Sequence, residues 1–211
     1  MDEKMMNNKA EFSGEIISEF EYSHEVLGEK FYTSVLYVER KSGAHDEIPF
    51  IVSERLVDVS EVWTGQIVKL FGQIRSYNKR NGDKFKLVLC VFVREISLLD
   101  EREKYDSNNV VIDGYICKEP IYRRTPLGRE IADVIFAVNR AYAKTDYVPS
   151  VFWGRNAEFI NCLDVGTRIK AVGRLQSREY IKKHEDGTVE TKTAYELSVS
   201  TFEVVEDEDN G

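Results

Sequence analysis

Two eight-residue segments decide the fold of this chain: Gly65-Gln-Ile-Val-Lys-Leu-Phe-Gly72 and Gly166-Thr-Arg-Ile-Lys-Ala-Val-Gly173. Both read glycine, then alternating residues with an apolar set at every second position, then glycine. They lie about one hundred positions apart in a chain of 211 residues. Alternation of this kind is typical of a β-strand with one buried face. The pair therefore predicts the same strand twice.

The match extends outward on both sides of these segments. Aligned pairs are Phe12-Ser-Gly-Glu-Ile16 with Ile112-Asp-Gly-Tyr-Ile116, Val35–Arg40 with Ile135–Arg140, and Ile48-Pro49 with Val148-Pro149. A shared order of glycines, a proline and apolar runs indicates one domain type used twice. Each copy is long enough to bury its own core. We divide the chain into 1–106, which ends in a polar linker from about residue 100, a second domain over 107–205, and an acidic tail over 206–211.

Short β-branched and aromatic runs, separated by Gly-containing turns, predict an all-β fold. In the second copy we expect strands near 110–118, 131–140, 147–153, 167–178 and 189–204, with one helix from Arg155 to Leu163. In the first copy we expect an equivalent helix between an N-cap at Ser53 and Gly65. Five strands with a helix between the third and fourth follow the order of the oligonucleotide/oligosaccharide-binding (OB) fold, a small Greek-key barrel. The sequence predicts two tandem OB barrels.

Composition is that of a soluble globular protein, with 42% hydrophobic and 31% charged residues. No run reaches the roughly 18 apolar residues of a membrane span, and the start carries no apolar secretory segment. The chain has three cysteines that lie far apart, Cys90, Cys117 and Cys162. Their odd number and wide spacing favour reduced core thiols and a cytoplasmic location.

The net charge of −8 is distributed unevenly along the chain. Residues 1–106 carry 15 basic and 20 acidic side chains, whereas 107–205 carry 14 and 13, and residues 206–209 add four acids. The second domain is therefore the electropositive part of an acidic protein. Phosphate binding is favourable only there.

Catalytic signatures are missing from the sequence. The sequence has no phosphate-binding Gly-Lys loop, no nucleophile elbow and no metal-spaced Cys/His cluster. The three histidines are not spaced as partners in a catalytic or metal site; they are His24, His45 and His184. We expect a protein that is not an enzyme, with no cofactor and no metal.

Cations repeat along the fourth strand of the second copy, and aromatic residues flank them. With a period of two, Arg168, Lys170, Arg174 and Arg178 share one strand face. Taken alone, this row is either a solvated face or a track for a phosphate backbone. Tyr147 and Trp153 share a face of the third strand, and rings beside cations suit single-stranded nucleic acid, whose bases stack on them. Trp153 either stacks on a base or caps the barrel core.

Six ordered segments of the second copy resemble the bacterial single-stranded DNA-binding protein family. They are Gly114–Pro120, Arg124–Gly128, Phe136–Arg140, Tyr147–Pro149, Phe152–Glu158 and Gly173–Tyr180. The resemblance spans nearly all of 110–204. It implies base stacking by Tyr147, Trp153 and Tyr180, with Tyr142 a looser match. It also implies phosphate contacts by the strand cations, extended through loop residues Arg123, Arg124, Arg129, Lys182 and Lys183.

The first copy resembles the family only in its skeleton. Glu47 stands at the position of Tyr147, Ser53 or Val52 at that of Trp153, and Lys79 at that of Tyr180. The outer face of its fourth strand has become partly apolar. We expect this face to be covered at a domain or subunit contact. The residues expected in the contact are Ile67, Phe71 and Tyr77.

Two functions follow from this pattern. The first is a non-catalytic protein that binds single-stranded DNA with little sequence preference in replication, recombination or repair. The alternative is an OB-fold scaffold in a replication, plasmid or phage assembly with weak or lost DNA binding. Family members commonly assemble four OB domains, so we expect a homodimer. Replication and repair proteins are expected partners and membranes are not, while the short acidic tail lacks the apolar tip by which family members recruit partners.

Overall fold

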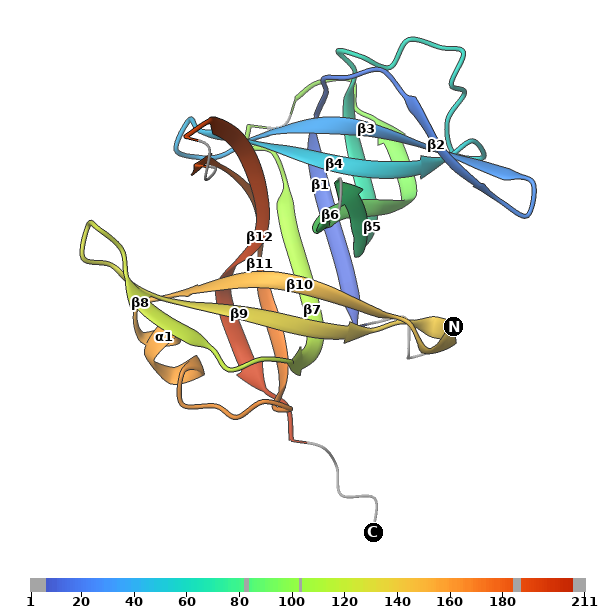
Figure 1. Cartoon of the computed structure of the whole chain (residues 1–211). Coiled ribbons are helices and arrows are strands. Elements are labelled where there is room, and N and C mark those ends of the chain that lie inside the picture. Colours follow the sequence, from blue (N-terminus) through green and yellow to red (C-terminus); the bar gives the residue numbers. More distant parts are fainter. Residues whose placement is uncertain (1–6, 82–83, 103, 184–186, 207–211) are drawn as a thin grey trace.

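Residues 7–81, 84–102, 104–183 and 187–206 are described by a computed structural model of the chain (Figure 1). They form two β-barrels that share one sheet of 12 strands. The predicted all-β fold with two OB domains is confirmed. In Figure 1 the first barrel lies above the second, with β1 and β7 side by side between them.

The first barrel consists of six strands: β1 (Asn8–Ile16), β2 (Glu21–Val26), β3 (Glu29–Glu39), β4 (His45–Ser53), β5 (Ile67–Asn81) and β6 (Lys84–Leu98). Antiparallel pairs join β2 with β3, β3 with β4 and β5 with β6, while β4 pairs with β6 in parallel and β1 pairs with β5. Closure comes from a short pairing of β1 with β3, at Glu15 and Ile16.

The second barrel repeats this order with β7 (Asn108–Ile116), β8 (Ile121–Arg124), β9 (Glu130–Asn139), β10 (Thr145–Trp153), β11 (Arg168–Lys183) and β12 (Val189–Val204). A 3-10 turn, η2 (Ala141–Ala143), precedes β10, and α1 (Arg155–Ile160) follows it. The strand β8, absent from the sequence prediction, pairs with β9. The helix is three residues shorter than predicted.

The first-domain helix predicted between Ser53 and Gly65 is wrong, because the segment forms turns. The Asp58 carboxylate accepts hydrogen bonds from the backbone N–H and hydroxyl of Ser60, at 2.9 and 2.6 Å. Such local bonds compete with helical ones. Trp63 donates its indole N–H to the Asp58 carbonyl and packs on Phe20, so the turns and this ring cover the barrel end instead.

The glycines that end the two opening segments allow close strand approach at matching bulges. A Cβ on Gly72 would lie 2.2 Å from the Phe92 carbonyl oxygen, and one on Gly173 would lie 2.3 Å from that of Ser198. In both barrels the register shifts at this glycine, between β5 and β6 in the first and between β11 and β12 in the second. The bulge bends the strand so that it can serve two parts of a barrel wall.

The cores are aliphatic with a few buried rings, Phe12 and Phe50 in the first barrel and Phe136 and Phe152 in the second. The cysteine prediction is only partly correct. Cys90 is buried and burial raises the pKa of its thiol to about 12, but Cys117 is half-buried and Cys162 is exposed. In the described part of the chain, no helix is long and apolar enough to cross a membrane.

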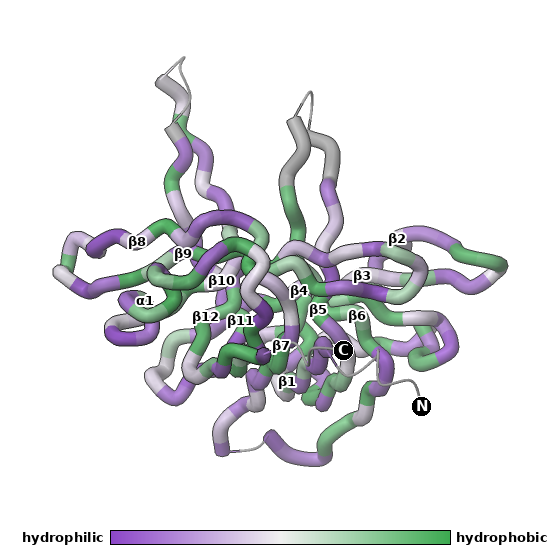
Figure 2. Tube along the Cα trace, turned by 90° about the horizontal axis from the view of Figure 1, so that it is seen from below, coloured by the Kyte–Doolittle hydropathy of each residue, from purple (hydrophilic) through white to green (hydrophobic). Residues whose placement is uncertain are grey.

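Two long hairpins, β5–β6 and β11–β12, rise from the same side of the molecule (Figure 2). Both strands of the second hairpin have 16 residues, and β11 extends five residues beyond the predicted end at 178. The hairpins also touch the opposite barrel, because β11 contacts β4 and β5 contacts β10. The long hairpin of each barrel therefore packs against one strand of the other barrel, β4 or β10.

Candidate nucleic-acid interface

Two aromatic side chains stand on the outer face of β10. The strand alternates between Val148 and Phe152 in the core and Tyr147 and Trp153 outside, with the exposed fractions of the two outer rings at 47% and 37%. The indole N–H of Trp153 donates to the Ser198 hydroxyl on β12, at 3.1 Å. This bond holds the ring at the surface, so Trp153 is not a core cap.

Cations and acids form a network on the strands beside these rings. Arg123 of β8 donates to Asp133 of β9, which raises the pKa of the arginine, and the charge of Glu196 adds to this effect. Arg178 of β11 pairs loosely with the same Glu196, at 3.8 Å. Both arginine side chains are about half exposed. A phosphate that approached this face would meet two guanidinium groups tethered to surface acids.

The four strand cations do not share one surface. Arg168 makes a two-bond ion pair with Asp113 of β7, and Lys170 pairs with Glu203 of β12. Arg174 lies six residues beyond Arg168, about 20 Å along the strand. Its guanidinium contacts Asp46 of the first domain at 3.5 Å, and burial lowers its pKa, followed by the charge of Arg40. The predicted alternation along β11 is nevertheless present, since Ile169, Ala171, Gly173 and Leu175 are buried.

The remaining predicted residues lie around the edges of this face. Tyr142 in η2 is 94% exposed and has a left-handed backbone (φ 60°), while Tyr180 on β11 is half-buried opposite Lys192. Arg124 pairs with Glu130 at 2.8 Å, Arg129 lies exposed between β8 and β9, and Lys182 is half-buried. The side chain of Lys183 lies outside the described residues.

The domains meet along a pseudo-symmetric junction that the sequence reading missed. Strand β1 pairs with β7 in antiparallel register, from Asn8 opposite Ile112 to Phe12 opposite Asn108. The side chain of Asn8 makes two hydrogen bonds with the backbone of Ile74, and that of Asn108 makes two with Leu175. Each domain therefore uses an asparagine at the equivalent position of its first strand to fix its own hairpin strand at the junction.

Two fully buried aspartates close the junction at its ends, and we name the sites after them. At the Asp46 seam (Arg40, Asp46, Arg174, Ser177), the carboxylate accepts from both arginines and from the Ser177 N–H at 2.8 Å. At the Asp146 seam (Arg75, Ser76, Arg140, Asp146), it accepts from both arginines and from the Ser76 N–H at 2.7 Å. The signal was available: both aspartates stand two residues before an inward Ile48 or Val148.

The first domain presents a different outer face at the same positions. Ser53, at the place of Trp153, is buried and bonded to Glu29, and Phe92 stands where Ser198 receives the indole. Phe31, Ile51 and Phe92 form a small apolar cluster there. Neither Phe71 nor Tyr77 is covered by the second domain, because their exposed fractions are 38% and 42%, and Ile67 is half-buried. The predicted domain-contact role of this face is thus not observed within one chain, and the subunit alternative stays a prediction.

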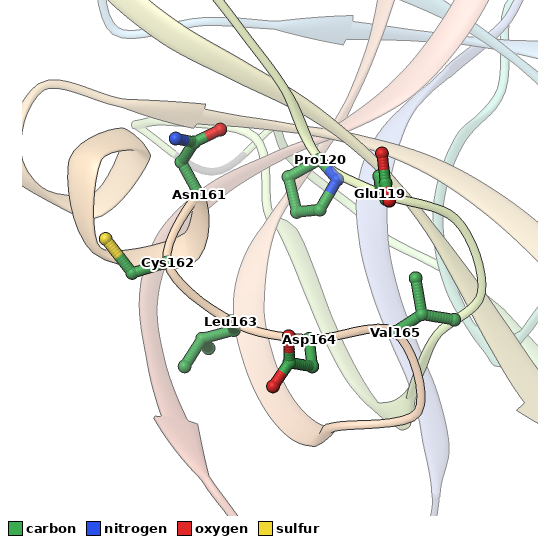
Figure 3. A pocket seen from close by; sticks show the side chains of 7 residues that line it. All are labelled: Glu119, Pro120, Asn161, Cys162, Leu163, Asp164 and Val165. Atoms are coloured by element: carbon green, nitrogen blue, oxygen red, sulfur yellow. The ribbon is translucent and has the colours of Figure 1, made fainter.

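A pocket of about 550 Å³ opens at the far end of the second barrel, between the loop after β7 and the loop after α1 (Figure 3). Its lining includes two carboxylates, Glu119 and Asp164, and no cation. Such a lining repels phosphate groups. Within the described residues, no three His, Cys, Asp or Glu side chains gather as a metal site.

Comparison with known proteins bears on this geometry. Residues 107–205 match the model of the single-strand binding protein family. That domain belongs to the family. The span contains both rings on β10 and all the second-domain cations considered above, so the family domain and the candidate interface coincide.

Relatives and solved structures agree with this assignment. The single-stranded DNA-binding protein of Bacillus cereus is 38% identical over 80 residues, 35% of this chain and 47% of that protein; for single-stranded DNA-binding protein A of Bacillus subtilis the figures are 38%, 35% and 46%. The chain thus spans about half the length of the curated relatives it matches. The wild-type single-stranded DNA binding protein from Thermus aquaticus superimposes with a TM-score of 0.70, covering 97% of this chain and 95% of that one at 19% identity. At this identity the likeness shows the fold alone, and it includes both barrels.

Proposed function

We propose that this chain binds single-stranded DNA with little sequence preference, as a non-catalytic protein of replication, recombination or repair. The observation that carries the proposal is the outer face of β10, where Tyr147 and Trp153 stand exposed between tethered arginines. Exposed rings stack on any base, and cations follow the backbone. The match of 107–205 to the single-strand binding protein family supports the same function.

The roles differ among the proposed contacts. Tyr147 and Trp153 form the stacking platform, with Arg123 and Arg178 as the nearest phosphate contacts. Tyr142, Tyr180, Arg124, Arg129, Lys182 and Lys183 extend the path along the loops and the hairpin. Arg168 and Lys170 join it only when a strand continues around β11, because they pair with acids of β7 and β12. Arg174 contributes to binding indirectly, because its ion pair with Asp46 helps to hold the second domain against the first.

Titration with a dT oligomer at two or more salt concentrations tests the function. We expect quenching of tryptophan fluorescence and a plot of log K against log[salt] that falls by about 0.7 per phosphate neutralised. Four contacts would give a slope near −3. No binding at low salt would overturn the proposal and leave the scaffold function. Equal affinity for duplex DNA would also contradict it, because stacking requires unpaired bases.

The first domain is proposed to act in structure and protein contact rather than as an independent DNA-binding unit. Its face lacks the two rings of β10, and its charge is negative. The exposed Phe71, with Lys69 over its ring at 5.3 Å, marks the proposed contact with a second copy, which would bring four OB domains together. The proposed compartment is the cytoplasm, which the three free cysteines support.

Light scattering at micromolar concentration tests the dimer. We expect a mass near twice the 24.4 kDa of one chain, and a mass of one chain for Phe71→Glu, because burying a charged carboxylate in an apolar contact is costly. Lys118→Ala, in an exposed loop of the other domain, is the control. A wild-type mass of one chain would rule out the stable dimer, and an unchanged mass for folded Phe71→Glu would place the contact elsewhere.

A further inference from the structure

The two seams have the same skeleton but opposite charge balance. Next to the Asp46 seam lie Glu47 and Glu196, and Glu196 accepts from Gln176 at 2.7 Å and pairs with Arg178. At the Asp146 seam the corresponding residues are Tyr147 and Cys90, neither of which carries a charge: Cys90 lies opposite Arg75 in the register where Glu196 lies opposite Gln176. The Asp146 seam has thus lost two carboxylates relative to its counterpart.

A third arginine adds to this imbalance. Arg94 of β6 lies exposed with its guanidinium over the Phe92 ring, at 4.9 Å from the centroid. The pKa of Arg75 is lowered by burial first, then by the charge of Arg140, while Asp146 opposes this and Arg94 lowers it further. Within the described residues, Asp146 is the only carboxylate that forms an ion pair with Arg75 or Arg140, and none of the ion pairs involves Arg94. Two arginines therefore share one buried carboxylate, and the positive charge of Arg94 acts on one of them.

The guanidinium groups keep donors available. Arginine carries five N–H donors, and Arg140 spends one of them on Asp146, at 3.5 Å, with its side chain 30% exposed. Arg94 lies over a ring face, and none of the ion pairs of the described residues involves its guanidinium, so its N–H donors can turn to an oxyanion. By contrast, Arg75 is bonded to both Asp146 and Gln73 and is mostly buried, so it supplies charge rather than contact.

The seam is continuous with the stacking face. The Ser76 hydroxyl of the first domain accepts the backbone N–H of Tyr147 at 2.8 Å, which fixes the start of the platform strand against β5. A DNA strand that stacks on Tyr147 and continues toward the first domain would therefore meet the excess positive charge next. We propose that the Asp146 seam binds a phosphate group of single-stranded DNA as the strand crosses from the second domain to the first, with Arg94 and Arg140 as the contacts.

This inference rests on the proposed function and assigns the first domain a part in it through its edge at the seam. Arg94 is the residue to change, since it is exposed and its loss leaves the Asp146 bonds intact. Arg94→Ala should weaken binding of a dT oligomer of about 30 nucleotides roughly two- to fivefold, as for an exposed ion pair. The slope of log K against log[salt] should become shallower by about 0.7.

Two further variants sharpen the experiment. Arg94→Lys keeps the charge and should retain the wild-type salt slope. Lys118→Ala removes one positive charge from an exposed loop at the far end of the second barrel, and it should bind like the wild type. If Arg94→Ala binds with the affinity and slope of Lys118→Ala, the seam carries no phosphate and the inference is wrong. If the wild-type chain binds no dT oligomer at all, the proposed function itself fails.

Discussion

The equivalent strands β4 and β10 of the two domains have nearly the same burial pattern and differ in the side chains that they expose to solvent. Both have nine residues, and their burial agrees at seven positions, with a buried aspartate second in each. On the outer face, Glu47 of β4 is at the position equivalent to Tyr147 of β10. At the strand end, a buried Ser53 is equivalent to an exposed Trp153. Inward residues thus preserve the barrel and the seam in both copies, while outward residues decide whether a copy offers bases a surface.

The largest expected effect is on stability, and it tests whether the buried aspartates of the two seams are equally important. Asp46→Ala and Asp146→Ala should each lower the free energy of unfolding by about 3–5 kcal/mol, because each leaves buried arginine charge without its partner. Urea denaturation measures the loss. The Asp146 variant should also weaken dT binding of the folded fraction, since Ser76 would no longer be fixed beside Tyr147.

Asp133→Ala provides the matched control for these aspartates. Its carboxylate pairs with Arg123 at the surface, with 38% of the side chain exposed, so its removal should cost less than about 1 kcal/mol. Seam variants that lose no more stability than this control would show that the aspartates do not hold the domains together.

The next effect concerns the outward difference at the strand end. Trp153→Ala should weaken binding of a dT oligomer by about 1–3 kcal/mol, the usual contribution of one stacked base. Because the ring is partly exposed and absent from the core, the thermal midpoint should change little. Gel shift or anisotropy with labelled DNA measures the affinity without tryptophan emission.

Trp63→Phe is the control for Trp153, since Trp63 packs on Phe20 in the first domain. It should leave DNA binding unchanged, and quenching by DNA should survive in it. A Trp153→Ala protein that binds DNA normally but melts far earlier would make the ring a structural one.

The sequence predicted most of what depends on alternation and on glycines. The barrels, their strand order and the outward position of Tyr147 follow from a period of two. The aligned glycines Gly72 and Gly173 were part of the repeat, but the bulges at them were found only in the structure. The first-domain helix was beyond this reasoning, because Asp58 and Ser60 favour a local turn over helical bonds. Neither could the period of two show that Arg174 faces another domain, since its partner Asp46 is 128 positions away.

The charge partners explain the same limit at the interface. A row of cations on β11 predicted a single track, but a strand of 16 residues turns around the barrel, so Arg168 and Arg178 meet different acids. Their pairing requires the fold, because Asp113 and Glu196 come from different strands. The sequence therefore identified the residue types of the site better than their grouping.

The smallest expected effect runs in the opposite direction, by restoring one outward residue. Glu47→Tyr places a ring at the position of Tyr147 and removes a carboxylate, so dT affinity should rise by at most about 1 kcal/mol, the low end of base stacking. The substitution leaves the seam intact, because Glu47 donates to the Ser177 hydroxyl through its backbone N–H. Glu47→Gln separates the two causes, since it removes the charge without adding a ring. A larger gain for the tyrosine variant would show that a base can reach β4 of the first domain. Equal gains would mean that only charge was changed, and that without a ring at Ser53 the first domain cannot hold a base.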